Sequence, residues 1–296
     1  MQPVTLEENA YHEGAAALPP ASQLAGNLSG EAVLGRIGPL LVRLARSKQE
    51  IAAAQSIRYK VFYQEMGARP PAAGALEERD ADRFDAICDH LLVIDSSLPG
   101  AEQDRIVGTY RLLPQEEAAA AGGFYSEDEF ELKALVARHP GRRFLELGRS
   151  CVLPPYRSKR TIELLWQGIW AYCRRKKIDV MTGCASFPGT VPAMHAEALS
   201  FLHHFCAAEG SWQVRANPAR YMPMDLMPEE AIVARQALFA MPPLIKGYLR
   251  LGAKFADGCV IDREFGTTDV LVVLPVEQIS DRYISYYGAE AERFAG

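Results

Sequence analysis

The sequence predicts a mixed α/β (α+β) fold in which one central sheet carries helices on its faces. Short apolar runs of strand length alternate with segments whose apolar residues recur at helical spacing. Their order is a strand and a helix, then two strands, then strand–helix–strand–helix–strand, which is typical of a single mixed sheet. The 296 residues, 49% apolar and 23% charged, supply an ample core for such a domain.

The N-terminal part predicts an arm, then a strand and a helix. Residues 1–35 are rich in Ala, Pro and Gly and lack apolar periodicity, so we expect a flexible arm ahead of a single domain over 36–296. A strand at 40–45 precedes a helix over about 47–66. Ser47 is a good N-cap residue for this helix, because a glutamate follows three positions later.

The next segment predicts a loop and an antiparallel pair of strands. Residues 68–86 carry many charges and follow a helix-ending glycine, so we interpret them as a charged loop. The segments 90–95 and 106–113 are apolar and strand-sized. The polar connection between them contains Pro99-Gly100, which indicates a hairpin.

The rest of the chain predicts alternating strands and helices after a segment rich in Ala and Gly. We expect, in order, a helix around 128–138, a strand at 144–152, a helix at 160–177, a strand at 180–184, helices at 193–207, 228–239 and 243–252, and a strand at 268–275. No internal repeat is apparent.

Charge and cysteine content exclude several classes of protein. A net charge of −5 argues against a general nucleic-acid binder, because neutralising phosphates requires a basic surplus. The six cysteines form no CxxC pair, so we expect no metal site and no disulfide framework. We also expect no tightly bound cofactor.

The apolar segments are too short to cross a membrane. The longest runs, such as 270–274, have the length of a strand. Glu7 and Glu8 stand where a signal peptide carries positive charge. We therefore expect a cytoplasmic protein.

The residues best suited to chemistry lie between Arg58 and Arg149. In order, this stretch contains Arg58-x-x-Val61-Phe62 on the first helix, Asp82-x-Phe84-Asp85 in the charged loop, and then Gly108-x-x-Arg111 and Glu146-x-x-Arg149 on two strands. Arg58 and Phe62 share a helix face at i, i+4 spacing. Arg111 lies in an apolar strand and requires a partner, because an unpaired buried guanidinium is costly.

In this order the motifs resemble those of the acyl-homoserine-lactone synthases, GNAT-fold enzymes that take acyl groups from acyl carrier protein. The chain more closely resembles the ornithine N-acyltransferase family, which makes lyso-ornithine lipid from 3-hydroxyacyl carrier protein and ornithine. The resemblance covers roughly residues 40 to 275. The segments that carry it are 57–67, 85–93, 146–152, 165–169 and 247–253.

The resemblance implies a GNAT acyltransferase that moves a 3-hydroxyacyl group from acyl carrier protein to the α-amine of ornithine. No residues indicate an acyl-enzyme, so direct attack of the amine on the thioester is the simpler mechanism. Two alternatives stay open: an enzyme of this kind that acts on another amine, such as an acyl-homoserine-lactone synthase, and a GNAT-shaped binding module without catalysis. The lipid product implies transient contact with the inner face of the membrane.

Glu146 and Arg149 are the expected catalytic residues. Thioester aminolysis requires a base for the proton of the amine. Burial on a sheet strand is expected to raise the pKa of Glu146 toward the range that suits a base, and the resemblance places the base at this glutamate. The alternative is a pair of structural charges on opposite faces of the strand.

The acceptor amino acid requires a cation for its carboxylate and an anion for its side-chain ammonium. Arg58 or Arg111 can supply the cation, with Phe62 beside Arg58. Asp82 and Asp85 can supply the anion. The alternatives are a surface arginine at position 58 and a solvated charged loop at the two aspartates.

The loop before the long helix indicates the donor. GNAT enzymes that use CoA carry a glycine-rich pyrophosphate loop there, whereas residues 156–161 contain no glycine. The basic residues Arg157, Lys159 and Arg160 suit the single phosphate of a phosphopantetheine arm. We therefore expect acyl carrier protein as the partner, unless these three are ordinary surface charges.

Overall fold

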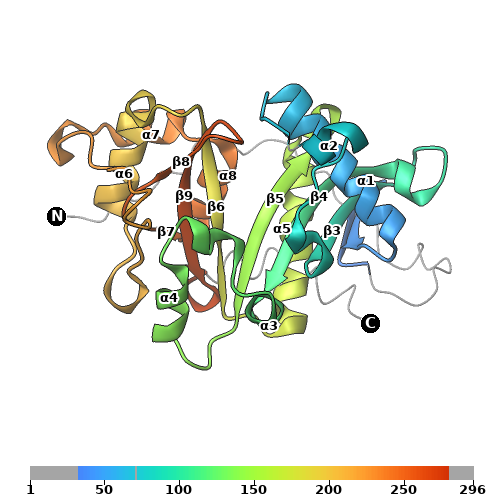
Figure 1. Cartoon of the computed structure of the whole chain (residues 1–296), viewed down its shortest axis with the longest axis horizontal. Coiled ribbons are helices and arrows are strands. Elements are labelled where there is room, and N and C mark those ends of the chain that lie inside the picture. Colours follow the sequence, from blue (N-terminus) through green and yellow to red (C-terminus); the bar gives the residue numbers. More distant parts are fainter. Residues whose placement is uncertain (1–32, 71, 280–296) are drawn as a thin grey trace. The chain divides into compact units, whose positions relative to one another are not determined.

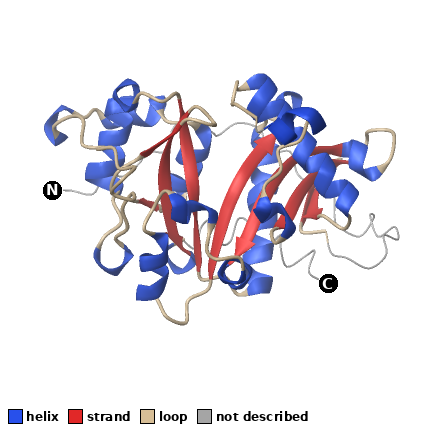
Figure 2. Cartoon of the chain, in the orientation of Figure 1, coloured by secondary structure: helices blue, strands red, loops and turns tan. Residues whose placement is uncertain are grey.

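The structure, a computed structural model, describes residues 33–70 and 72–279. The first 32 residues of the predicted arm lie outside this part, so the arm stays a prediction. The described residues form a nine-stranded sheet with helices on both faces (Figures 1 and 2). The predicted mixed sheet is therefore confirmed.

The sheet follows the order β1-β2-β3-β4-β5-β6-β9-β7, and β8 also pairs with β9. All these pairings are antiparallel except β5 with β6, which is parallel. The strands are β1 (Gly35–Ile37), β2 (Leu40–Leu44), β3 (Asp89–Asp95), β4 (Ile106–Pro114), β5 (Phe144–Val152), β6 (Val180–Pro188), β7 (Lys254–Phe255), β8 (Val260–Asp262) and β9 (Thr267–Pro275).

Eight α-helices lie among the described residues. They are α1 (Lys48–Tyr59), α2 (Ala72–Glu77), α3 (Gln115–Ala120), α4 (Leu132–Arg138), α5 (Lys159–Lys176), α6 (Ala196–Cys206), α7 (Ala234–Ala240) and α8 (Pro243–Arg250). A π-helical segment, Lys60–Glu65, continues α1. The predicted N-cap of α1 is confirmed, because the Ser47 side chain accepts a hydrogen bond from the backbone N–H of Glu50 at 3.2 Å.

Alternating side chains of the strands pack against helices on opposite faces of the sheet. Val42 and Leu91 belong to the core cluster that contains α5, whereas Leu41 and Leu92 pack with α1. The same rule holds on the other side of the molecule. There Val272 and Leu274 pack with α6 and α8, and Leu271 and Val273 belong to the cluster of α4.

Several local expectations are corrected. The predicted loop at 68–86 contains α2 and the 3-10 turn Arg83–Ala86. The Ala/Gly-rich segment forms α3, because its alanines favour helix, and the helix expected from 128 begins only at Leu132. The short strands β1, β7 and β8 were not predicted, because two or three residues give no readable alternation.

Candidate active site

The cavity that holds most of the predicted site residues, here called the main cavity, lies where β5 and β6 separate. The two strands pair only where Phe144–Glu146 of β5 lie beside Val180–Thr182 of β6. Beyond these pairs both strands continue, and their diverging parts line a cavity of about 350 Å³. Gly183 stands at the point of separation with φ +146°, and a side chain there would meet the carbonyl oxygen of Leu147 at 2.2 Å. Only glycine lets the strands approach this closely before they part.

A bulge in β5 directs Arg149 into this cavity. Between the pairs Thr109↔Cys151 and Arg111↔Gly148, β4 contributes one residue and β5 contributes two, Arg149 and Ser150. Arg149 has φ +53°, a left-handed conformation that costs a non-glycine residue about 1–2 kcal/mol. Bulges of this kind re-aim side chains beside active sites.

The Arg149 guanidinium contacts two aromatic rings and two carboxylates. Its carbon lies 4.8 Å from the ring centroid of Tyr125 and 4.6 Å from that of Phe265. Its nitrogens lie 3.2 Å from Asp80 and 3.3 Å from Asp82. The surrounding anions and the Tyr125 hydroxyl raise the pKa of Arg149 despite burial, so it stays charged.

Arg58 is not the surface residue that the sequence alternative offered: its side chain is fully buried. It binds both carboxylate oxygens of Asp85, at 2.8 and 2.9 Å, and Asp80 at 2.8 Å. Although burial acts to raise it, these bonds hold the pKa of Asp85 at about 2. Arg58 thus has no side-chain surface for a substrate carboxylate, and its predicted substrate contact has no support in this geometry.

The two predicted anionic partners are also occupied. Asp82 lies 2.7 Å from Arg111 and caps the 3-10 turn by accepting from the N–H of Phe84 at 2.8 Å. Asp85 accepts from the N–H of Asp82 at 2.9 Å in addition to its pair with Arg58. A buried carboxylate without a partner would be costly. The pairing of these aspartates with arginines therefore holds the loop against the sheet. Neither offers the free carboxylate that an ammonium would need.

Glu146 lies at the base of the cavity and is 4% exposed. It accepts hydrogen bonds from the N–H groups of Tyr125 and Ser126, both at 2.8 Å, and from the Ser126 hydroxyl. Burial raises the pKa of Glu146, and the three donors partly oppose that rise. The side chain is therefore fixed in orientation, with an elevated proton affinity.

The other predicted residues divide between the cavity and the surface. Phe62, on the π-helical segment, lines the cavity and meets the Phe265 ring edge-on at 5.6 Å. Arg157 also lines it and pairs with Glu65 at 2.5 Å. Lys159 and Arg160 are exposed on the first turn of α5 and do not line the cavity. The site thus joins Phe62, Arg111, Glu146, Arg149 and Arg157.

Sequence reasoning missed the acidic residues on the β6–β9 side. Asp269 lines the main cavity together with Cys184, and Glu129 lines a second cavity of about 660 Å³. Tyr125 and Asp262 line both cavities, so the two adjoin. The sequence offered one signal: Asp269 is a single charged residue within an apolar strand. Arg111 was singled out for the same reason.

Comparisons with known proteins agree with this architecture. A family model described as an acetyltransferase (GNAT) domain matches residues 57–167. The L-ornithine N(alpha)-acyltransferase of Brucella abortus (strain 2308) is 64% identical over 90% of this chain and 95% of its own length. That of Agrobacterium fabrum (strain C58) is 62% identical over 90% of this chain and 91% of its own.

Solved structures are similar at lower identity. FeeM, an N-acyl amino acid synthase from uncultured soil microbes, is 12% identical, with a TM-score of 0.46 over 80% of this chain and 91% of its own. The acyl-homoserine-lactone synthase LasI is 11% identical, with a TM-score of 0.44 over 84% of this chain and 95% of its own.

The sheet, the separation of β5 from β6 and the domain match define an acyltransferase of the GNAT fold. Within that class the chain belongs to the L-ornithine N(alpha)-acyltransferase family, with which it shares 59–64% identity over nearly its whole length in three relatives. Among the described residues, no helix is both long enough and apolar enough to span a membrane.

Proposed function

We propose that this protein transfers a 3-hydroxyacyl group from acyl carrier protein to the α-amine of ornithine and so produces lyso-ornithine lipid. The observation that carries the proposal is 64% identity, across 90% of the chain, to a protein named L-ornithine N(alpha)-acyltransferase. Because the product is a lipid, we expect transient contact with the inner face of the membrane.

The donor side of the proposal rests on the open edge of β5 and on the loop before α5. Past Glu146 the backbone of β5 has no partner in β6, so its free peptide groups suit the amides of a pantetheine arm. The loop at 156–161 lacks the glycines that a CoA pyrophosphate requires. Arg157 at the cavity and the exposed Lys159 and Arg160 suit one phosphate and an acidic carrier.

In the reaction, the neutral α-amine attacks the thioester carbonyl, a C–N bond forms and the C–S bond breaks. Glu146 takes the proton that the amine loses, and the pantetheine thiolate leaves and is protonated. The raised proton affinity of the buried Glu146 suits this role. Arg111 and Arg149 line the same cavity and offer positive charge to the acceptor carboxylate.

The proposal is tested by incubating the purified protein with 3-hydroxyacyl carrier protein or 3-hydroxyacyl-CoA and a panel of amino acids. Products are identified by mass. We expect acylornithine from the carrier protein donor, and little product from CoA. Transfer from CoA alone would contradict the donor, and preferential acylation of another amine would contradict the acceptor.

A further inference from the structure

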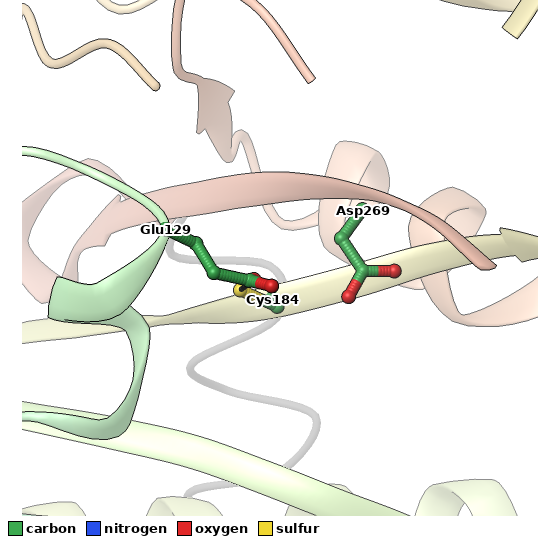
Figure 3. A group of neighbouring side chains, drawn as sticks. All are labelled: Glu129, Cys184 and Asp269. Carbon is green, nitrogen blue, oxygen red and sulfur yellow. Dashed lines mark hydrogen bonds between the residues drawn. The ribbon is translucent and has the colours of Figure 1, made fainter. Parts of the chain in front are cut away.

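A buried acidic group lies between the two cavities. Glu129 follows the turn before α4, Cys184 belongs to β6 and Asp269 belongs to β9. One oxygen from each acid and the Cys184 sulfur all lie within 4.8 Å of one another (Figure 3). Glu129 and Asp269 are only 5% and 6% exposed. Two carboxylates are thus buried side by side next to the substrate cavity.

This group carries more negative charge than its surroundings neutralise. Glu129 pairs with Arg220 at 3.1 Å and accepts a hydrogen bond from the Cys184 thiol at 3.3 Å. The Oδ1 atom of Asp269 is buried, yet it has no hydrogen-bond partner within the described ranges 33–70 and 72–279. A buried carboxylate oxygen without a donor is costly, so this oxygen suits a hydrogen-bond donor or a cation.

The neighbouring negative charge also raises the proton affinity of Asp269. Burial and the nearby charge of Glu129 raise the pKa of Asp269 to about 7, although the hydroxyls of Ser186 and Thr267 oppose the rise. Burial raises the pKa of Glu129 as well, although Arg220 opposes the rise. Both acids therefore favour an added positive charge.

The other carboxylates that line the main cavity are already satisfied. Glu65 pairs with Arg157 at 2.5 Å. Glu146 accepts from Tyr125 and Ser126. Asp262 accepts from two backbone N–H groups, those of Glu264 and Phe265, at 2.8 and 2.9 Å. Asp269 is thus the lining carboxylate with an unused buried oxygen.

The chemistry of the group favours an ammonium over a soft metal ion. Burial and the charge of Glu129 raise the pKa of Cys184 well above its usual range, so its sulfur is a neutral thiol rather than a thiolate ligand. An alkylammonium has three donors and no requirement for thiolate. The Ser126 hydroxyl lies 3.3 Å from the Cys184 sulfur and bonds Glu146, which links this group to the proposed base.

We propose that Glu129 and Asp269 bind the side-chain ammonium of a diamino acid acceptor and so determine the acceptor specificity. This inference rests on the proposed function and deepens it. The acceptor enters from the second cavity, its side-chain ammonium binds the acidic pair, and its α-amine faces Glu146 in the main cavity.

The test compares ornithine with norvaline, which has the same carbon chain but no side-chain ammonium. Calorimetry measures the binding of each to the wild type, Asp269→Asn, Glu129→Gln and a matched control, Glu131→Gln. Glu131 is an exposed acid two residues from Glu129 that lines neither cavity. We expect Asp269→Asn to weaken ornithine binding by about 10²-fold, the scale of a lost buried charge contact. The control should change it by less than about 2-fold.

Equal binding of ornithine and norvaline by the wild type would overturn the proposal. So would an equal loss of both ligands in Asp269→Asn, because that pattern indicates a general structural effect. Thermal stabilisation by Zn²⁺ or Mg²⁺ that depends on Asp269, with ornithine binding unchanged, would assign a metal site instead. Acylation is assayed in parallel: selective ornithine binding without acyl transfer would contradict the proposed function and leave the ammonium site standing.

Discussion

Glu146 combines burial with three hydrogen-bond donors, and these two features act in opposite directions on its proton affinity. Burial raises the pKa and makes the carboxylate a stronger base, while the donors partly oppose that rise and fix its orientation. A freely solvated glutamate would have neither property. At the residue scale the site is therefore a carboxylate of fixed orientation. Arg111 and Arg149, which line the same cavity, both lie over the ring of Tyr125.

Glu146→Gln should lower kcat by about 10²-fold, the scale of general-base catalysis. The new amide must turn an NH₂ toward a backbone N–H, so the variant should also lose about 1–3 kcal/mol of stability. Rates are therefore normalised to folded protein by circular dichroism. Ser126→Ala keeps the carboxylate and removes one donor, so it should lose far less activity. Undiminished turnover in folded Glu146→Gln would remove Glu146 from the base role.

Asp269 should make stability depend on pH. Its folded pKa of about 7 lies above the ordinary value of 3.8, so the folded state holds this proton more tightly than the unfolded state. The contribution of Asp269 to stability is therefore greatest at low pH and is lost as pH rises toward 7.

Asp269→Asn should consequently be more stable than the wild type at pH 8, by at most about 4 kcal/mol, and nearly equal to it at pH 4. Urea denaturation of both proteins across this range measures the difference, and other titrating groups cancel in the comparison. A difference that does not change with pH would contradict the assignment.

At the scale of elements, ion pairs hold the segment between α2 and β3 against the sheet. Arg58 from α1 binds Asp80 and Asp85, while Arg111 from β4 and Arg149 from β5 bind Asp82. Three elements thus converge on one short acidic segment. The strained conformation of Arg149 persists because these contacts determine it.

Arg58→Ala should cost about 3–5 kcal/mol of stability, because it leaves two carboxylates buried without their main partner. Arg79→Ala is the matched control, since Arg79 is 43% exposed and forms only a 3.8 Å pair with an exposed glutamate. It should cost less than about 1 kcal/mol. Urea denaturation compares the two, and equal losses would show that burial of the pair is not what stabilises this segment.

Much of the element scale could be predicted from sequence, because it depends on local signals. Strand alternation, the Ser47 cap and the need of Arg111 for a partner all follow from short-range chemistry. The burial of Arg58 and the raised pKa of Asp269 could not be predicted. Both depend on tertiary structure: Asp80 and Asp85 pair with the arginine, while burial and then the charge of Glu129 act on the aspartate.

At the scale of the whole molecule, the two halves of the sheet serve different substrates in our account. The β5 side offers the open strand edge and basic residues to the carrier-bound donor. The β6–β9 side offers carboxylates to the acceptor. The separation of β5 from β6 brings these surfaces together in one cavity.

The carrier protein should dock near the first turn of α5. Lys159→Glu with Arg160→Glu should raise the KM for acyl carrier protein by about 10-fold at low salt, with less effect at high salt, because screening weakens exposed charges. Arg175→Glu with Lys177→Glu, at the other end of α5, is the matched control. A larger effect of the control pair would move the docking site to that end.

The central claim is that ornithine lies across the cavity with its side-chain ammonium on the acidic pair and its α-amine at the thioester. Tandem mass spectrometry of the product from 3-hydroxyacyl carrier protein and ornithine tests this directly, because it locates the amide nitrogen. The account predicts acylation at the α-nitrogen only. Acylation at the side-chain nitrogen would contradict it.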